Sequence, residues 1–188
     1  RHTRSDRDWS SDVCSSDLPS DPAQTPLTGA GITIAMIDSG VSVPSELSTY
    51  VGQASFRADG ICSTLGSGKE QFESYCFSNA SASGDAYGHG THLATLISNE
   101  SNDELNGISA GIAPDANILS VQILDENGLG TYEDLIEGIQ YVVENKDLYN
   151  IRVINLSLSA YASTPYFMDP VNRAVETAWA RDRKSTRL

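Results

Sequence analysis

The sequence has few residues of the types that bind transition metals. It contains three histidines, at positions 2, 89 and 92, and three cysteines, at positions 14, 62 and 76. Zinc sites on helices usually pair two histidines four residues apart and require a third ligand. His89 and His92 are only three residues apart, so a zinc site at this pair is a weak alternative and no metal site is predicted.

Basic residues and long apolar runs are also scarce. The chain has 12 Lys and Arg against 25 Asp and Glu, which gives a formal net charge of −13. Such an acidic chain repels the phosphates of nucleic acids and of anionic membranes. No apolar run approaches the ~20 residues that a membrane span requires. The sequence therefore predicts neither a nucleic-acid partner nor a membrane partner.

The two ends of the chain are related as inverted copies of one DNA segment. Residues 182–188, DRKSTRL, can be encoded by GATCGGAAGAGCACACGTCTG, and the complementary strand in another frame encodes DVCSSD, which stands at residues 12–17. We therefore predict that residues 1–18 and 182–188 are translated sequencing adapter and exclude them from the fold. The remaining cysteines, Cys62 and Cys76, lie in a Gly/Ser-rich region. The sequence allows either a disulfide between them or two free thiols.

Apolar strands alternate with amphipathic helices along residues 19–181. The strands are predicted at residues 31–40 (GITIAMIDSG), 117–124 (NILSVQIL) and 152–158 (RVINLSL). Strands that are apolar throughout are typical of a parallel sheet with helices on both faces. We predict an α/β fold of this class. Residues 41–87, rich in Gly, Ser and Ala, are expected to form a surface excursion with at most short elements.

Helical periodicity occurs in three segments. Residues 90–97 place three apolar side chains on one face, namely Leu93, Leu96 and Ile97. The second helix follows a sequence that resembles a capping box, with Thr131 and Asp134 as the box and Leu135, Ile136, Ile139, Val142 and Val143 as the apolar stripe. The third helix opens with a capping residue and a first-turn proline, Asp169-Pro170, and is expected to turn inward Val171, Ala174, Val175 and Ala178.

Two polar residues are placed where chemistry is expected. Asp38 ends an apolar strand, and ligands gather at the carboxyl ends of parallel strands; the alternative is an Asp that only caps its own turn. His89 stands between Gly88 and Gly90 at the start of a helix, where the helix dipole disfavours a charged imidazole and leaves it able to accept a proton. A packing role is the alternative for His89.

A nucleotide-binding sheet is a further hypothesis, suggested by TGAG at residues 28–31. The glycines that bind phosphate in such sheets follow the first strand and open a helix. Gly29 and Gly31 instead precede the strand, so this hypothesis is weaker than the acid–base interpretation of Asp38 and His89.

Four sequence blocks together point to one family. They are AMIDSGV around Asp38, GHGTHLATLIS around His89, GIAPDANILSVQILDENGLGTYEDLIEGI from Gly111, and VINLSLS from Val153. In this order they resemble the subtilisin-like serine proteases, the subtilases, over nearly all of residues 31–181, with residues 62–82 as an insertion. The resemblance implies a subtilisin-like three-layer fold and a serine endopeptidase. It also implies a monomeric, secreted or cell-envelope enzyme that acts on peptides or proteins and needs no cofactor for its chemistry.

The resemblance also assigns roles to individual residues. Asp38 would be the carboxylate and His89 the general base of an Asp/His/Ser triad, while His92 would be structural. One wall of the first specificity pocket would be formed by Ser157, Leu158 and Ser159. The segment that pairs with the substrate backbone by strand addition would be Gly128, Leu129 and Gly130. Asn102, Asp103 and Asn106 fall near a place where many relatives bind calcium, but such a polar turn is more often only solvated, so no calcium site is identified.

The sequence departs from the family in three respects. Ser159 stands where glycine is usual and is expected either to narrow the entrance of the first specificity pocket or to shift its backbone. Leu129 stands where a small residue is usual and is expected to crowd the more distant hydrophobic subsite. The Gly-Thr-Ser-Met-Ala run that carries the nucleophile is absent, as is the later asparagine of the oxyanion hole. We therefore predict a partial catalytic domain over residues 19–181, truncated on its C-terminal side and inactive alone. The alternative is a catalytically dead module that binds peptide or has a structural role.

Overall fold

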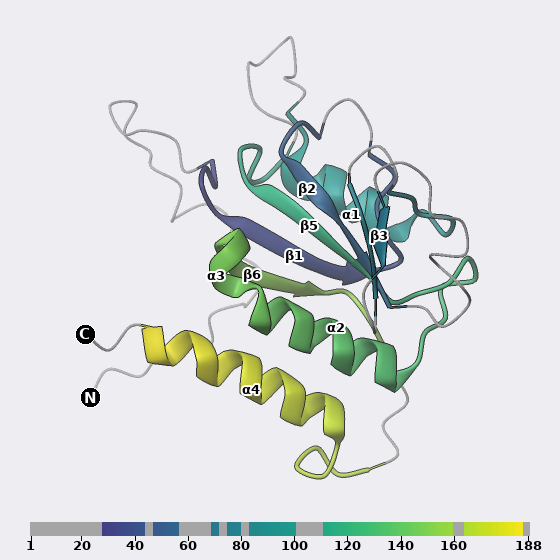
Figure 1. The fold of residues 1–188 in the computed structure, drawn as a ribbon, viewed down its shortest axis with the longest axis vertical. Helices are drawn as coiled ribbons and strands as arrows, with labels where there is room; N and C mark the ends of the chain where they lie inside the picture. Colours follow the sequence, from purple (N-terminus) through teal and green to yellow (C-terminus); the bar gives the residue numbers. More distant parts are fainter. Residues whose placement is uncertain are drawn as a thin grey trace, which may run out of the picture.

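A six-stranded sheet in the order β3-β4-β2-β5-β1-β6 runs through the centre of the protein (Figure 1). Four neighbouring strands are parallel: β2 (Tyr50–Ser55), β5 (Asn117–Gln122), β1 (Thr33–Asp38) and β6 (Ile151–Leu156). The other two are antiparallel to their neighbours: β3 (Lys69–Gln71) and β4 (Cys76–Ser78). The computed structural model describes residues 28–43, 47–56, 69–71, 75–79, 83–100, 111–159 and 164–185.

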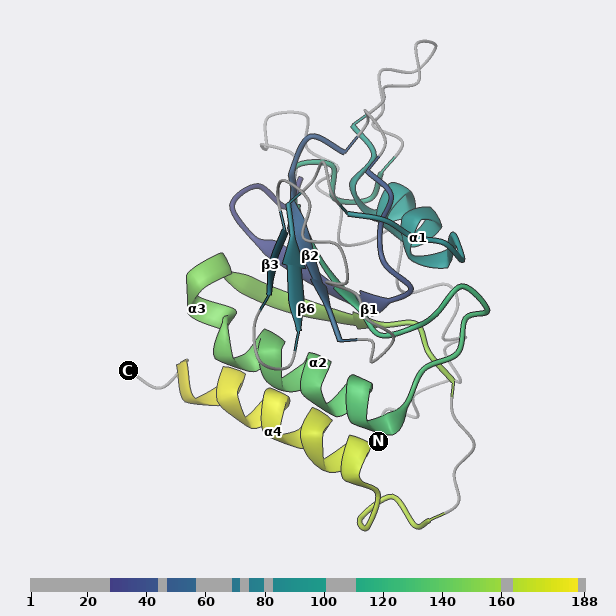
Figure 2. The same ribbon diagram turned by 45° about the vertical axis from the view of Figure 1, so that its right-hand side comes forward.

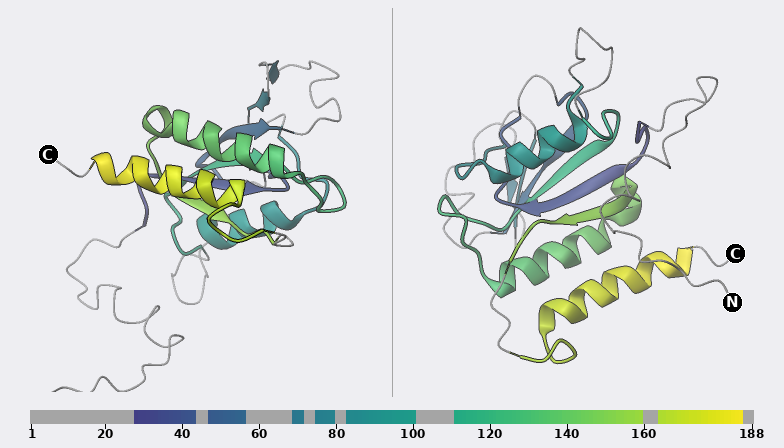
Figure 3. Two further views of the ribbon diagram at one scale, coloured as in Figure 1. Left: turned by 90° about the horizontal axis from the view of Figure 1, so that it is seen from below. Right: turned by 180° about the vertical axis from the view of Figure 1, so that it is seen from behind.

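Helices cover both faces of this sheet (Figure 3). α1 (His89–Ser98) lies on one face, and α2 (Tyr132–Glu144) lies on the other, followed by the short helix α3 (Lys146–Tyr149). α4 (Pro170–Ser185) lies beside α2 (Figure 2). The predicted α/β fold, a parallel sheet with helices on both faces, is confirmed.

Strand β1 is buried along its whole length because its side chains alternate between two cores. Ala35 and Ile37 pack in the cluster that includes Ile139 and Val142 of α2. Ile34 and Met36 pack in the cluster on the other face, around Ala94 of α1. A strand buried on both faces reads as a continuous apolar run, which is why residues 31–40 could be assigned from sequence.

The expectation of at most short elements in residues 41–87 is wrong for β2, a six-residue strand inside the sheet. Its sequence, YVGQAS, contains a glutamine and a glycine and lacks a long apolar run. Gln53 is nevertheless only 4% exposed. Its amide donates to the Gly84 carbonyl and to Gln122 Oε1, and its Oε1 accepts from the Val41 N–H. Hydrogen bonds thus offset the burial of this polar side chain.

The helix predictions are confirmed in existence and differ in their buried faces. The capping box of Thr131 and Asp134 is present at the start of α2. In α1 the buried positions are Gly90, Ala94 and Ser98, four residues apart. Of the apolar face predicted for α1, Leu93 and Ile97 pack against the core as expected. Leu96 does not: it is 50% exposed, on the side of the helix opposite the buried positions, and His92 is exposed on that side too. In α4 Ala174 and Ala178 pack against the core as expected, whereas Val175 is 38% exposed.

One sheet edge in the described part of the chain is β6, which pairs there with β1 alone. This strand is less covered than the sequence suggested, since Val153 and Leu156 are 46% and 38% exposed. No helix in the described ranges is long and apolar enough to cross a membrane. The predicted adapter segments fall largely outside the described residues, and their origin stays a prediction.

The structure partly resolves whether the cysteines of residues 19–181 form a disulfide. Cys76 of β4 is disulfide-bonded, and its partner lies outside the described residues. The polar turn with Asn102, Asp103 and Asn106, which the sequence analysis did not assign as a calcium site, also lies outside them.

Candidate active site

The polar residues predicted from sequence gather at the carboxyl edge of the parallel strands. Asp38 is the last residue of β1, and its neighbours across the sheet are Gln122 of β5 and, one residue back, Leu156 of β6. The backbone carbonyl of Asp38 also accepts hydrogen bonds from the N–H groups of Ile123 and Leu124. These backbone hydrogen bonds fix the end of β1 and so the position from which the Asp38 side chain extends.

Asp38 and His89 form a hydrogen-bonded pair across 51 positions of sequence. His89 Nδ1 lies 2.8 Å from Asp38 Oδ1 and 3.0 Å from Oδ2. The carboxylate also accepts the Ser39 N–H at 2.7 Å, and the residue is 1% exposed. A buried carboxylate needs such partners. Because Asp38 accepts at Nδ1, that nitrogen carries the proton, and Nε2 is left unprotonated in the neutral ring.

A close backbone approach brings this pair together. Gly90, the residue after His89, is pressed against the turn that follows Asp38. A Cβ atom at Gly90 would lie 2.1 Å from the carbonyl oxygen of Gly40, a distance that real Cβ atoms essentially never show. Ser39 Oγ accepts the Gly90 N–H at 3.0 Å. The glycine after the histidine is thus required for the contact between α1 and the β1 turn.

We expect Gly90→Ala to separate His89 from Asp38 and to lower the free energy of unfolding by about 1–3 kcal/mol, because its methyl group overlaps rigid backbone. Gly84→Ala is the matched control, since nothing lies within 4 Å of a Cβ there and its φ is not positive. Thermal unfolding of the two variants checks this. Equal stability of the two would show that the close approach is not required.

A cleft of about 450 Å³ opens beside the pair. Its lining includes every predicted site residue except Asp38, which lies buried behind the histidine: His89, Gly128, Leu129, Gly130, Ser157, Leu158 and Ser159. His89 has a side chain 38% exposed, so its imidazole is reachable from the cleft. Three separate parts of the sequence, the α1 start, the β5–α2 connection and the end of β6, therefore meet at one opening.

The segment 128–130 is held in a tight turn by Asp125, a residue that the sequence analysis did not single out. Asp125 Oδ1 accepts the N–H groups of Asn127 and Leu129, each at 2.8 Å. The Asp125 N–H donates to the Leu129 carbonyl at 2.7 Å. Leu129 itself is 68% exposed at the rim of the cleft.

Tyr87 is a second cleft residue that sequence reasoning missed. Its ring centroid lies 6.4 Å from that of His89, and the ring also covers Gly128. A Cβ atom at Gly128 would lie 2.6 Å from Tyr87 Cζ, so the ring occupies the space that a side chain would need. Tyr87 is 51% exposed and bridges the histidine to the turn at Gly128. Its place two residues before His89, in a glycine-rich approach, was the available signal.

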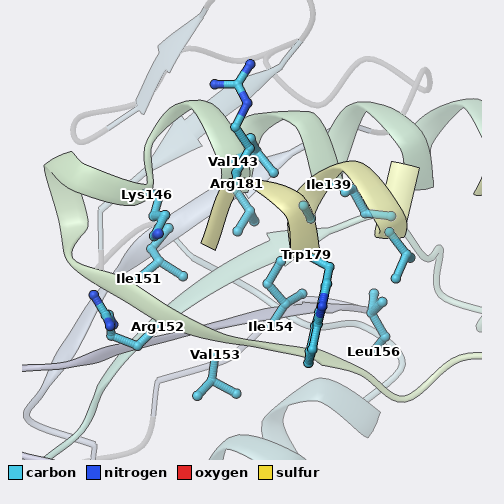
Figure 4. A pocket seen from close by; sticks show the side chains of 13 residues that line it. Ile139, Val143, Lys146, Ile151, Arg152, Val153, Ile154, Leu156, Trp179 and Arg181 are labelled. Atoms are coloured by element: carbon cyan, nitrogen blue, oxygen red, sulfur yellow. The ribbon is translucent and has the colours of Figure 1, made fainter. Parts of the chain in front are cut away.

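A second groove, of about 330 Å³, lies between β6, α2 and α4 (Figure 4). Its lining is mainly apolar and includes Val153, Leu156 and Trp179. The ionisable groups around it are all basic, namely Lys146, Arg152 and Arg181. Its lining contains no carboxylate, histidine or hydroxyl group, whereas the lining of the cleft at His89 contains a histidine and several hydroxyl groups.

The competing interpretations of these residues gain no support from the geometry. In the part of the chain that the structure describes, no group of three or more His, Cys, Asp or Glu is placed to hold a metal ion. Gly29 and Gly31 form a turn before β1, at the edge of the sheet opposite Asp38. A phosphate site there would lie away from the cleft.

Comparison with known proteins adds the family. The model of the subtilase family of peptidases, S8, matches residues 29–187, which is most of the chain. The chain belongs to the subtilase family. Its strand order and helix placement fit that assignment, because it superposes on the crystal structure of a cold-adapted subtilisin-like serine proteinase with a TM-score of 0.55. That match has 26% sequence identity and covers 84% of this chain and 46% of the other.

Two curated proteases of Bacillus subtilis (strain 168) are similar to most of this chain. The minor extracellular protease Epr is 34% identical over 150 residues, which cover 80% of this chain and 19% of that protein. The major intracellular serine protease is 36% identical over 152 residues, which cover 79% of this chain and 40% of that protein. The chain thus spans less than half the length of these two proteases, one named as extracellular and the other as intracellular.

Proposed function

We propose that this subtilase chain supplies the acid–base pair and one side of the substrate cleft of a serine endopeptidase. The observation that carries the proposal is the contact of His89 Nδ1 with the buried Asp38 carboxylate, at a cleft that His89 itself lines. The attacking serine is proposed to come from sequence beyond these 188 residues, because the Gly-Thr-Ser-Met-Ala run does not occur among them.

The pair is suited to accept a proton from a serine hydroxyl during attack on a peptide carbonyl. His89 Nε2 would take that proton while the serine oxygen bonds to the carbonyl carbon, and would then return it to the leaving amine. Asp38 would stabilise the imidazolium formed in between. Because Asp38 is 1% exposed, its charge acts with little solvent screening. Water would hydrolyse the resulting acyl-enzyme through the same two residues.

The substrate is proposed to be an extended peptide. The Asp125-anchored turn would present the backbone of Gly128, Leu129 and Gly130 for strand addition. Ser157, Leu158 and Ser159 would form the wall of the pocket for the residue before the scissile bond. Ser159 and Tyr87 both occupy cleft volume beside these segments, so we expect a preference for substrates with small side chains next to the cleavage site.

The remaining parts of the proposal concern cofactor, assembly and location. A triad needs no metal or organic cofactor for its chemistry, and any calcium would be structural. We propose that the enzyme is a monomer with no nucleic-acid or membrane partner, which the net charge of −13 supports. The disulfide at Cys76 supports a secreted or cell-envelope location, because disulfides persist in oxidising compartments.

The decisive experiment uses the protein encoded by the complete gene, sequenced past Arg181. We expect it to hydrolyse a casein substrate and to be labelled covalently by a fluorophosphonate, which reacts with activated serines. The 188-residue chain expressed alone is expected to show neither property. A complete protein that folds, keeps Asp38 and His89, and is neither labelled nor active would instead support a non-catalytic peptide-binding module.

A further inference from the structure

The start of helix α1, which carries His89, needs acceptors for its first N–H groups. The N-cap position is Gly88, in a left-handed conformation with φ 91°, and it has no side chain to accept them. The N-cap residue of α1 therefore accepts none of these N–H groups through a side chain. Since His89 is the first residue of α1, whatever holds this turn also sets the position of the imidazole.

Asp85, three residues before the N-cap, supplies the missing acceptor. Its Oδ2 accepts the Thr91 N–H at 2.8 Å and the Thr91 hydroxyl at 2.6 Å. Its Oδ1 accepts the Gly88 N–H at 2.8 Å. The two oxygens therefore bind the residues on both sides of the His89–Gly90 pair, and the carboxylate closes the loop on which His89 stands.

Hydrogen bonds also join the segment from Asp85 to Thr91 to the turn that follows Asp38. The Asp85 N–H donates to Ser42 Oγ at 3.0 Å, and the Ser42 N–H donates to Thr91 Oγ1 at 2.9 Å. Thr91 Oγ1 thus donates to Asp85 and accepts from Ser42. Together with the bond from the Gly90 N–H to Ser39 Oγ, this network joins the base-bearing turn to the acid-bearing turn.

We propose that Asp85 is a positioning residue for catalysis: through Gly88 and Thr91 it fixes the turn that holds the His89 imidazole against Asp38. This inference rests on the proposed function, in which His89 is the general base. Asp85 does not line the cleft, and no hydrogen bond joins its carboxylate to the His89 ring in the described structure. Its effect on the reaction therefore passes through the backbone.

The charge of Asp85 matters as well as its shape. Burial alone raises the pKa of its carboxyl, but hydrogen bonds from the Thr91 side chain and from the Thr91 and Gly88 backbone outweigh burial, and the net pKa is lowered. A negative charge at a helix N-terminus is also favourable. Because the folded pKa is below the ordinary value, this stabilisation is present above about pH 4 and is lost as the pH falls through the lowered pKa.

The test compares four variants of the complete gene product. Asp85→Ala removes all three acceptor contacts, and Asp85→Asn keeps one acceptor oxygen without the charge. Thr91→Val removes only the hydroxyl and is the mild variant in case Asp85→Ala does not fold. The matched control is Asp169→Ala, because Asp169 also caps a helix, accepting the Val171 and Asn172 N–H groups at 2.8 and 3.1 Å, and lies outside the cleft.

Two readouts separate positioning from plain stability. The first is the low-field proton resonance of the His89 Nδ1–H, which reports the hydrogen bond to Asp38 without requiring turnover. The second is kcat, measured separately from KM. For Asp85→Ala we expect loss of the resonance and a fall in kcat of about 100-fold, the cost of about 1 Å of misplacement, with KM changed by less than about threefold. Asp85→Asn and Thr91→Val should fall between it and the wild type.

The control sets the outcomes apart. Asp169→Ala should lose thermal stability while keeping the resonance and kcat, as expected if capping α4 does not touch His89. The proposal is overturned if Asp85→Ala keeps the wild-type resonance. If Asp85→Ala does not fold, the proposal is overturned when both Thr91→Val and Asp85→Asn keep that resonance. A wild-type protein with the resonance but without turnover would overturn the proposed function, while the resonance still decides the role of Asp85.

Discussion

If the proposed function holds, replacing His89 by alanine is expected to reduce the kcat of the complete gene product about a million-fold, which is the loss on removing one member of a catalytic triad. The reason lies in the geometry at the cleft: His89 is the histidine that contacts the Asp38 carboxylate, and its ring is the basic group exposed to the opening. Without Nε2, a serine hydroxyl has no acceptor for its proton and stays a weak nucleophile.

His92→Ala is the matched control, because His92 lies on the exposed face of the same helix. Its kcat/KM should match that of the wild type. Progress curves on a peptide amide and active-site labelling with a fluorophosphonate measure both effects. Turnover of His89→Ala within tenfold of the wild type would show that another group is the base.

The second large effect is expected at Asp38. Asp38→Asn preserves the shape of the side chain but is expected to lower kcat by about 10⁴-fold. The asparagine amide can donate to His89 Nδ1, which moves the ring proton to Nε2 and leaves no acceptor facing the cleft. The folded protein should remain intact, because the Ser39 N–H still finds an oxygen acceptor at residue 38.

Asp169→Asn is the comparison for this substitution, since Asp169 is also buried, at 8% exposure, and caps α4 outside the cleft. We expect its kcat to be unchanged. The nitrogen-15 shifts of the His89 ring in Asp38→Asn should show the proton on Nε2. A ring that keeps its proton on Nδ1 together with wild-type kcat would contradict the role of Asp38.

The strands and helices with a clear apolar period could be predicted from the sequence. β1, β5 and the capping box of α2 follow from local rules that the structure keeps. The strand-end rule singled out Asp38, whereas its pairing with His89 was implied by the resemblance to the subtilases. Features that depend only on local sequence pattern could therefore be predicted without the structure.

The missed features depend on contacts between distant segments. β2 was not assigned because Gln53 is buried through partners on other elements, Gln122 and Gly84, that no local window contains. Asp85 was not singled out because Ser42, 43 positions earlier, completes its network: the Ser42 hydroxyl accepts the Asp85 N–H, and the Ser42 N–H donates to Thr91. Gly90 packs against the backbone of the turn at Gly40, and this contact determines which face of α1 points to solvent. His92 lies on the exposed face, which the local sequence does not show.

The place of β3 and β4 at one end of the sheet suggests where evolution and engineering can change the length of this chain. They follow β2 in the strand order, so β2 and β5 both separate them from β1 and its carboxylate. Residues added between Gln71 and Cys76 would lengthen a connection at that end of the sheet, and loop length itself costs little free energy. Insertions there would vary the outer surface of the molecule while Asp38, Asp85 and His89 keep their relative positions.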